Sequence, residues 1–97
     1  MNFDEFVTLQ EVTMSPADHA NKIRASANKF HDATKANHKP GSMEYKDSKF
    51  VHEHMHKIAN HVEKGNYSEA QKLLHKNRWV ANSLIGKSQH NHINKHA

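Results

Sequence analysis

Histidine is the residue type with the greatest potential for chemistry in this chain, since 11 of its 97 residues are histidines and none is a cysteine. Three of them stand in the run from position 52 to position 56, which contains the spacing H-E-x-x-H. On a helix this spacing places His52 and His56 one turn apart on one face, with Glu53 beside them. It supplies the zinc-ligand pair and the general base of many metalloproteases.

His52 and His56 are therefore candidate metal ligands, and Glu53 is the candidate catalytic base if the motif works as it does in those enzymes. The common extension of the motif is absent, because position 59 is alanine rather than glycine and His61 falls one residue short of the expected third histidine. Another helix could supply a third ligand, but no spacing selects one of the candidates. These candidates are Glu69, His75 and His19.

The simpler interpretation is that these are boundary and surface histidines of a polar helix. On that interpretation we expect no enzymatic activity and no cofactor. Two alternatives stay open. One is a divalent-metal or zincin-like site that holds zinc at His52 and His56. The other is a pH-responsive module, in which histidines beside the core become charged below about pH 6.5 and loosen the packing.

The charge of the chain indicates a second kind of site. Lysine and arginine total 14 against 10 acidic residues, a formal charge of +4. Three of the acids, Asp4, Glu5 and Glu11, lie in the first eleven residues, so residues 12–97 keep all 14 bases with seven acids and carry +7. Such a balance favours a nucleic-acid backbone, or a protein partner, as the ligand.

Phosphate neutralisation needs charge rather than exact geometry, so bases that recur along helices are the candidates for polyanion binding. Solvated helix faces are the alternative interpretation. Only two of the bases are arginine and no aromatic residues alternate with them, which argues against sequence-specific readout. The candidate polyanion-binding residues are Lys22, Lys29, Lys35, Lys39, Lys72, Lys76 and Arg78.

Helix signals divide the chain into segments. Ser15 and Pro16 predict the start of a first helix, and Pro40 with Gly41 predicts its end. Ser42 predicts the cap of a second helix, and residues 68–86 read as a third. Apolar residues recur on one face of each helix. The expected inner faces are Ala20, Ile23, Ala27 and Phe30; then Val51, Met55, Ile58 and Val62; then Ala70, Leu73 or Leu74, Val80 or Ala81, and Leu84.

We therefore predict an all-α fold, a small antiparallel three-helix bundle formed by residues 15–87. Residues 1–14 are expected to form an acidic leader, helical in part, and a connector. Residues 88–97 are expected to form a histidine-rich, polar and flexible tail. No apolar run is long enough to span a membrane and no secretory signal is recognisable, so we expect an intracellular or virion-interior protein. Lean bundles of this size often self-associate, so a homodimer is a reasonable expectation.

The leader, MNFDEFVTLQE, resembles the N-terminal capsid-targeting peptides of internal head proteins of large contractile-tailed bacteriophages. Phe3, Glu5 and Phe6 match the aromatic and E-F pattern of those peptides. Leu9 and Glu11 match the motif after which a prohead protease cuts, which places the cleavage between Glu11 and the next residue, Val12. The resemblance covers about eleven residues. It implies a small basic protein that is packaged with the genome.

Overall fold

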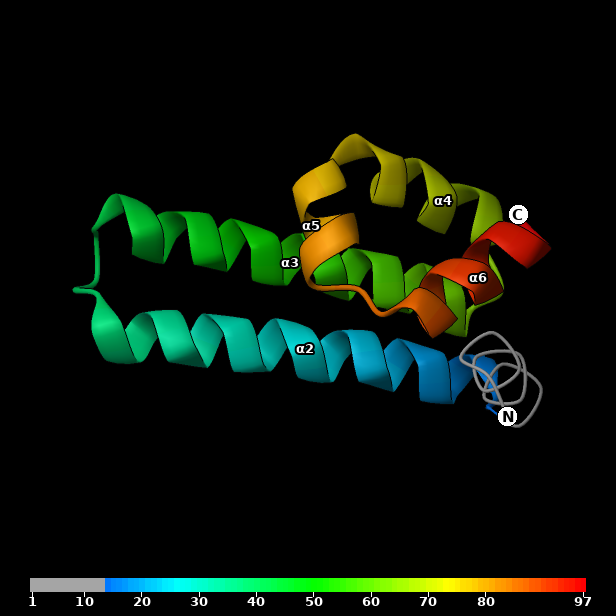
Figure 1. The fold of residues 1–97 in the computed structure, drawn as a ribbon, viewed down its shortest axis with the longest axis horizontal. Helices are drawn as coiled ribbons and strands as arrows, with labels where there is room; N and C mark the ends of the chain where they lie inside the picture. Colours follow the sequence, from blue (N-terminus) through cyan, green and yellow to red (C-terminus); the bar gives the residue numbers. More distant parts are fainter. Residues whose placement is uncertain (1–13) are drawn as a thin grey trace.

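A long helical hairpin forms the frame of the molecule (Figure 1). The computed structural model describes residues 14–97. Helix α2, Pro16–Asn37, runs antiparallel to helix α3, Met43–Glu63, and the two pack along their length. The described residues form helices and the turns between them, which confirms the predicted all-α class.

Three shorter helices follow the hairpin and complete the described part of the chain. Helix α4, Tyr67–Lys76, packs on α3, and α5, Arg78–Ser83, follows it directly. Helix α6, Lys87–His96, packs against both α4 and α2. These helices lie over the end of the hairpin that contains the start of α2 and the end of α3. The connection between α2 and α3, at the other end, therefore projects beyond them (Figure 1).

The predicted starts of the first two helices are confirmed by their caps. Ser15 Oγ accepts a hydrogen bond from the Asp18 amide, while the Asp18 carboxylate accepts one from the Ser15 amide, both at 3.1 Å. This reciprocal pair is a capping box. Ser42 Oγ accepts from the Tyr45 amide at 3.2 Å and caps α3. Gly65 adopts a φ of +78°, which lets the chain leave α3 where a residue with a Cβ would be strained.

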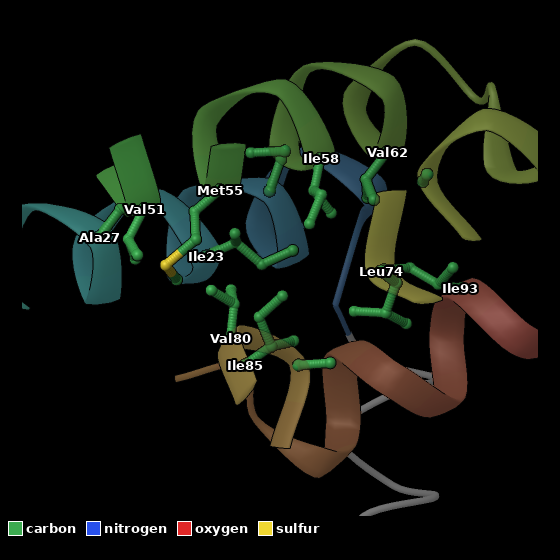
Figure 2. Packing of buried hydrophobic residues seen from close by; sticks show 14 residues of the cluster. Ile23, Ala27, Val51, Met55, Ile58, Val62, Leu74, Val80, Ile85 and Ile93 are labelled. Atoms are coloured by element: carbon green, nitrogen blue, oxygen red, sulfur yellow. The ribbon is translucent and has the colours of Figure 1, made fainter. Parts of the chain in front are cut away.

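The core lies where the hairpin meets the shorter helices. The inner faces predicted for the first two helices are buried, apart from Phe30, which is only partly buried. Val80 of α5 and Ile85 beyond it point toward the hairpin, and Leu74 and Ile93 meet beside Val62 (Figure 2). The buried apolar residues are Ala20, Ile23, Ala27, Val51, Met55, Ile58, Ala59, Val62, Ala70, Leu74, Val80, Ala81, Ile85 and Ile93.

The third predicted helix is broken in two, which corrects the expectation of one helix over residues 68–86. Asn77 has an extended backbone, with φ −130° and ψ 91°, between α4 and α5. Its side-chain oxygen accepts from the Val80 amide at 3.1 Å and so caps α5. Asparagine competes for backbone hydrogen bonds in this way, and the break turns Val80 toward the core.

The predicted flexible tail over residues 88–97 is wrong. This segment forms most of α6, and its buried residues are Ser88, Gln89, His92 and Ile93. Composition suggested a flexible tail because Ile93 is the only large apolar residue of the segment. That residue is fully buried and lies among core residues contributed by other helices, so α6 is held by tertiary packing.

Trp79, the only tryptophan in the sequence, lies at the surface of the molecule. Its side chain is 54% exposed, and its ring contacts Phe30 with a centroid separation of 5.7 Å.

Within the described part of the chain, no helix has the length and apolar content needed to cross a membrane. The leader and the predicted cleavage position, Glu11 and Val12, lie outside the described residues.

Candidate functional site

The H-E-x-x-H histidines face helix α2, where they share one partner. His52 Nε2 lies 2.7 Å and His56 Nε2 lies 3.2 Å from Oδ1 of Asn28. Their rings are 4.3 Å apart between centroids. The predicted pairing of His52 with His56 one turn apart is therefore present, and both Nε2 atoms are directed at a single point.

The shared acceptor defines the protonation of both rings. A side-chain carbonyl oxygen only accepts hydrogen bonds, so His52 and His56 each donate to it from a protonated Nε2. Burial lowers the pKa of His56, and the neighbouring His52 and Arg24 lower it further. A neutral imidazole is the form that binds metal ions, although an Nε2 atom that binds a metal would first have to lose the proton that it donates to Asn28.

A third histidine lies beside this pair. The ring of His31 is 5.2 Å from that of His52 between centroids, and its Nδ1 lies 2.9 Å from Ser48 Oγ. Because the Ser48 hydroxyl donates to the Tyr45 carbonyl at 2.9 Å, it accepts from His31, whose lone pair is then on Nε2. Burial lowers the pKa of His31, followed by the positive charge of Lys35 and the neighbouring His52.

These contacts belong to a polar seam along one side of the hairpin. Near the C-terminal end of α3, Arg24 donates to Glu63 at 3.0 Å and to Asn60 Oδ1 at 2.8 Å. The guanidinium holds the pKa of Glu63 below its usual range. The seam therefore joins α2 to α3 by side-chain hydrogen bonds, alongside the apolar core.

Glu53 lies on a different side of α3. It lines a pocket of about 220 Å³ between α3 and α4, together with Phe50, Lys57 and Lys76. His54 also lines this pocket, and its Nε2 donates to the Leu73 carbonyl at 3.0 Å. The motif is thus divided between two environments, with its histidines toward α2 and its glutamate toward α4.

The three residues proposed as a third metal ligand lie elsewhere in the molecule. Glu69 pairs with Lys72 at 3.2 Å, and His75 lines a cavity bounded by α4, α5 and α6. His19 stacks on His92, at the other end of the hairpin from the α2–α3 turn. Over residues 14–97, no group of three or more histidine, aspartate or glutamate side chains is arranged to hold a metal ion.

A second histidine cluster was missed because half of it lies in the segment expected to be flexible. The rings of His19 and His92 stack with centroids 4.1 Å apart and planes 16° from parallel. Tyr67 Oη lies 2.8 Å from His92 Nε2, and the His96 ring follows 4.7 Å from that of His92. Burial, with His19, His96 and Lys95 nearby, lowers the pKa of His92 to about 4. The i, i+4 spacing of His92 and His96 was the available sequence signal.

The candidate polyanion-binding residues are all exposed, but they do not share one face. Lys22 and Lys29 are seven residues apart on α2 and so lie within about 20° of each other around the helix axis. Lys35 lies about 120° away from Lys29 on the same helix and pairs with Asp32 at 3.4 Å. Lys72 is likewise paired, with Glu69. Candidate lysines without a carboxylate partner, such as Lys22 and Lys29, are therefore the better candidates for binding an external anion.

Comparison with known proteins finds no family model, no curated protein and no solved structure that matches the chain.

Proposed function

We propose that the protein is a small, basic, non-enzymatic helical protein that binds polyanions, with the nucleic-acid backbone as its ligand. The observation that carries the proposal is that acidic side chains form ion pairs more often than basic side chains do. Among the described residues, four carboxylates have an ion-pair partner, those of Asp32, Glu44, Glu63 and Glu69. In the same part of the chain, Arg24, Lys35 and Lys72 pair with a carboxylate, whereas Lys22, Lys29, Lys39 and Lys76 have no carboxylate within ion-pair distance.

The cations left over are distributed widely over the surface. Lys22 and Lys29 lie along α2, Lys39 lies at the turn of the hairpin, and Lys76 lies at the end of α4. A dispersed set of lysines neutralises phosphates without reading bases, because phosphate contacts fix position and carry no sequence information. Sequence-independent and strongly salt-dependent affinity is the expected behaviour.

Binding is tested by the salt dependence of affinity for a short duplex, measured by fluorescence anisotropy between 50 and 200 mM salt. Replacing the unpaired cations in a Lys22→Gln/Lys29→Gln variant should lower the slope of log K against log salt by about 1 to 2. The matched control is Lys35→Gln/Lys72→Gln, which removes the same charge from paired lysines and should change the slope less. Equal slopes for the two variants, or no measurable binding by the native chain at 50 mM salt, would contradict the proposal.

The resemblance of the leader extends this proposal to a phage head-associated role, in which the protein is packaged with the genome. Removal of residues 1–11 would raise the formal charge of the chain from +4 to +7 and so strengthen its attraction to DNA. Co-expression with a prohead protease should release a product that begins at Val12, detected by intact-mass analysis. An uncleaved chain under conditions that process a known internal head protein would contradict this role.

Divalent-metal binding is the second candidate, and the convergence of His52 and His56 on Asn28 favours it. Two neutral imidazoles one helical turn apart can chelate zinc, with the amide oxygen as a further ligand. Zinc binding should be measured by calorimetry on protein without a histidine tag. His56→Ala should abolish it, and His38→Ala, an exposed histidine in the hairpin turn, should not. Failure of the native chain to bind zinc would remove this candidate.

Placement of Glu53 on the α4 side of α3 supports a non-enzymatic role, because the motif's base is separated from its candidate ligands. A homodimer stays a prediction, which sedimentation velocity would check.

A further inference from the structure

A cavity of about 320 Å³ lies where α4, α5 and α6 meet. Its polar lining consists of Arg78, His75, His90, Asn82 and Asn94, and its apolar lining consists of Leu74 and Ala81. The lining thus combines a guanidinium, two imidazoles and two amides, and it contains no carboxylate. A cavity built from donors in this way matches an anion in charge.

Arg78 is the cation of this cavity, and its surroundings differ from those of Arg24, the other arginine of the chain. Arg24 is held by Glu63 across the hairpin at 3.0 Å. Among the described residues, no carboxylate lies within ion-pair distance of Arg78. An unpaired guanidinium offers a planar fork of N–H donors, which binds two oxygens of a phosphate at once.

Hydrogen bonds of the neighbouring residues position further groups of the lining. The Nε2–H of His90 donates to the Ala81 carbonyl, which holds that ring against α5. Asn94 Oδ1 accepts from Gln71 Nε2 at 3.1 Å. Since its oxygen is occupied, Asn94 has its NH₂ group left to offer to a ligand.

We propose that this cavity binds a phosphate monoester group, with Arg78 as the bidentate ligand and Asn82, Asn94 and His75 as further donors. A monoester has three terminal oxygens and nearly two negative charges at neutral pH, which suits several converging donors better than a backbone diester does. The proposal goes beyond the binding of nucleic-acid backbone by dispersed lysines. It does not depend on that binding, because the lysines of the duplex test lie outside this cavity.

Inorganic phosphate is the first probe, titrated into the ¹⁵N-labelled full chain and followed by NMR. Phosphate should shift the amide resonances of residues 74–82 and 90–94, and Arg78→Gln should weaken binding by about tenfold or more. Arg78→Lys should restore only part of the affinity, because an ammonium cannot bind two oxygens in a planar fork. Lys46→Gln, near the start of α3, removes the same charge outside this cavity and should leave the affinity unchanged. Equal losses in the Arg78→Gln and Lys46→Gln variants, or no loss in either, would overturn the assignment.

Further titrations distinguish two possible sources of the phosphate monoester, the end of a nucleic acid and a small metabolite. If the ligand is the end of a nucleic acid, a 5′-phosphorylated oligonucleotide should bind more tightly than its 5′-hydroxyl counterpart, and Arg78→Gln should remove the difference. If the ligand is a small metabolite, a nucleoside monophosphate should bind as tightly as the phosphorylated oligonucleotide and should lose affinity in the same variant. If neither probe is sensitive to Arg78, the cavity is not a phosphate site. Loss of duplex binding with phosphate binding retained would refute only the proposed function.

Discussion

His19 and His92 stack face to face, although 72 positions of the sequence separate them and they lie on the first and last helices that the structure describes. His92 is 4% exposed, and burial with three nearby basic groups lowers its pKa to about 4. The stack therefore joins α6 to α2 through a His92 ring that is packed in the neutral state. Protonation of His92 would place a positive charge in a region from which water is largely excluded.

This stack predicts a loss of stability in acid. The groups facing His92 are His19 from α2, Tyr67 from α4, and Lys95 and His96 from α6. An unfolded chain binds a proton at histidine near pH 6.5, but folded His92 binds one only near pH 4, so the unfolded state holds more protons between these values. Stability is therefore complete above about pH 7 and should fall as the pH drops toward 4.

The measurement is the melting temperature of the native chain and of His92→Phe across this pH range. Phenylalanine keeps an aromatic ring against His19 but cannot be protonated, so the native melting temperature should fall more steeply than that of the variant. A difference between the two proteins that does not change with pH would show that His92 does not titrate as its burial implies. A flat native profile would also remove the pH-responsive hypothesis.

Asn28→Asp should convert the shared acceptor of His52 and His56 into a carboxylate. A negative charge at this position would raise the pKa of His56, so the gain in stability should be largest below the unfolded pKa, near pH 5.5, and should disappear as the pH rises toward 8. Urea denaturation of the native chain and the variant at these two pH values measures the effect. The same change should strengthen zinc binding, because a carboxylate is a better ligand than an amide. A variant that is equally destabilised at both pH values would contradict the geometry.

Asn77→Ala should destabilise the protein by about 1 kcal/mol through loss of the α5 cap. Its side chain accepts a hydrogen bond from the Val80 amide, whereas Asn66, at the start of α4, makes no side-chain cap bond. Asn66→Ala is therefore a matched control and should change the free energy of unfolding only slightly. Chemical denaturation of both variants tests the comparison, and equal effects would show that the break at position 77 does not depend on this cap.

Ile93→Ala should destabilise the protein by about 2 to 4 kcal/mol, because it empties space in a closely packed core. Ile93 is completely buried in the segment whose composition suggested a flexible tail. Lys95→Ala, two residues later at an exposed position, is the control and should cost little. Thermal denaturation measures both. A negligible effect of Ile93→Ala would mean that α6 does not contribute to the folded core in solution.

The sequence by itself determined the local features of this protein. The caps at Ser15 and Ser42, the breaks at Pro40 and Gly65, and the apolar faces of the first two helices depend on neighbouring residues, and local chemistry reveals them. Helical periodicity also places His52 and His54 on different sides of α3, and in the structure His52 faces α2 while His54 faces α4.

Only the tertiary structure decided the features that depend on distant residues. Helix α6 contains one apolar residue and has no local reason to be stable, so its order depends on the pocket that other helices provide for Ile93. The stacking of His92 on His19 and the cavity at Arg78 likewise combine side chains from different helices. Periodicity assigns each residue to a face of its own helix, but tertiary packing determines which other helix contacts that face. The H-E-x-x-H spacing is present in the sequence, whereas the shared contact with Asn28 and the separation of Glu53 from it come from the fold.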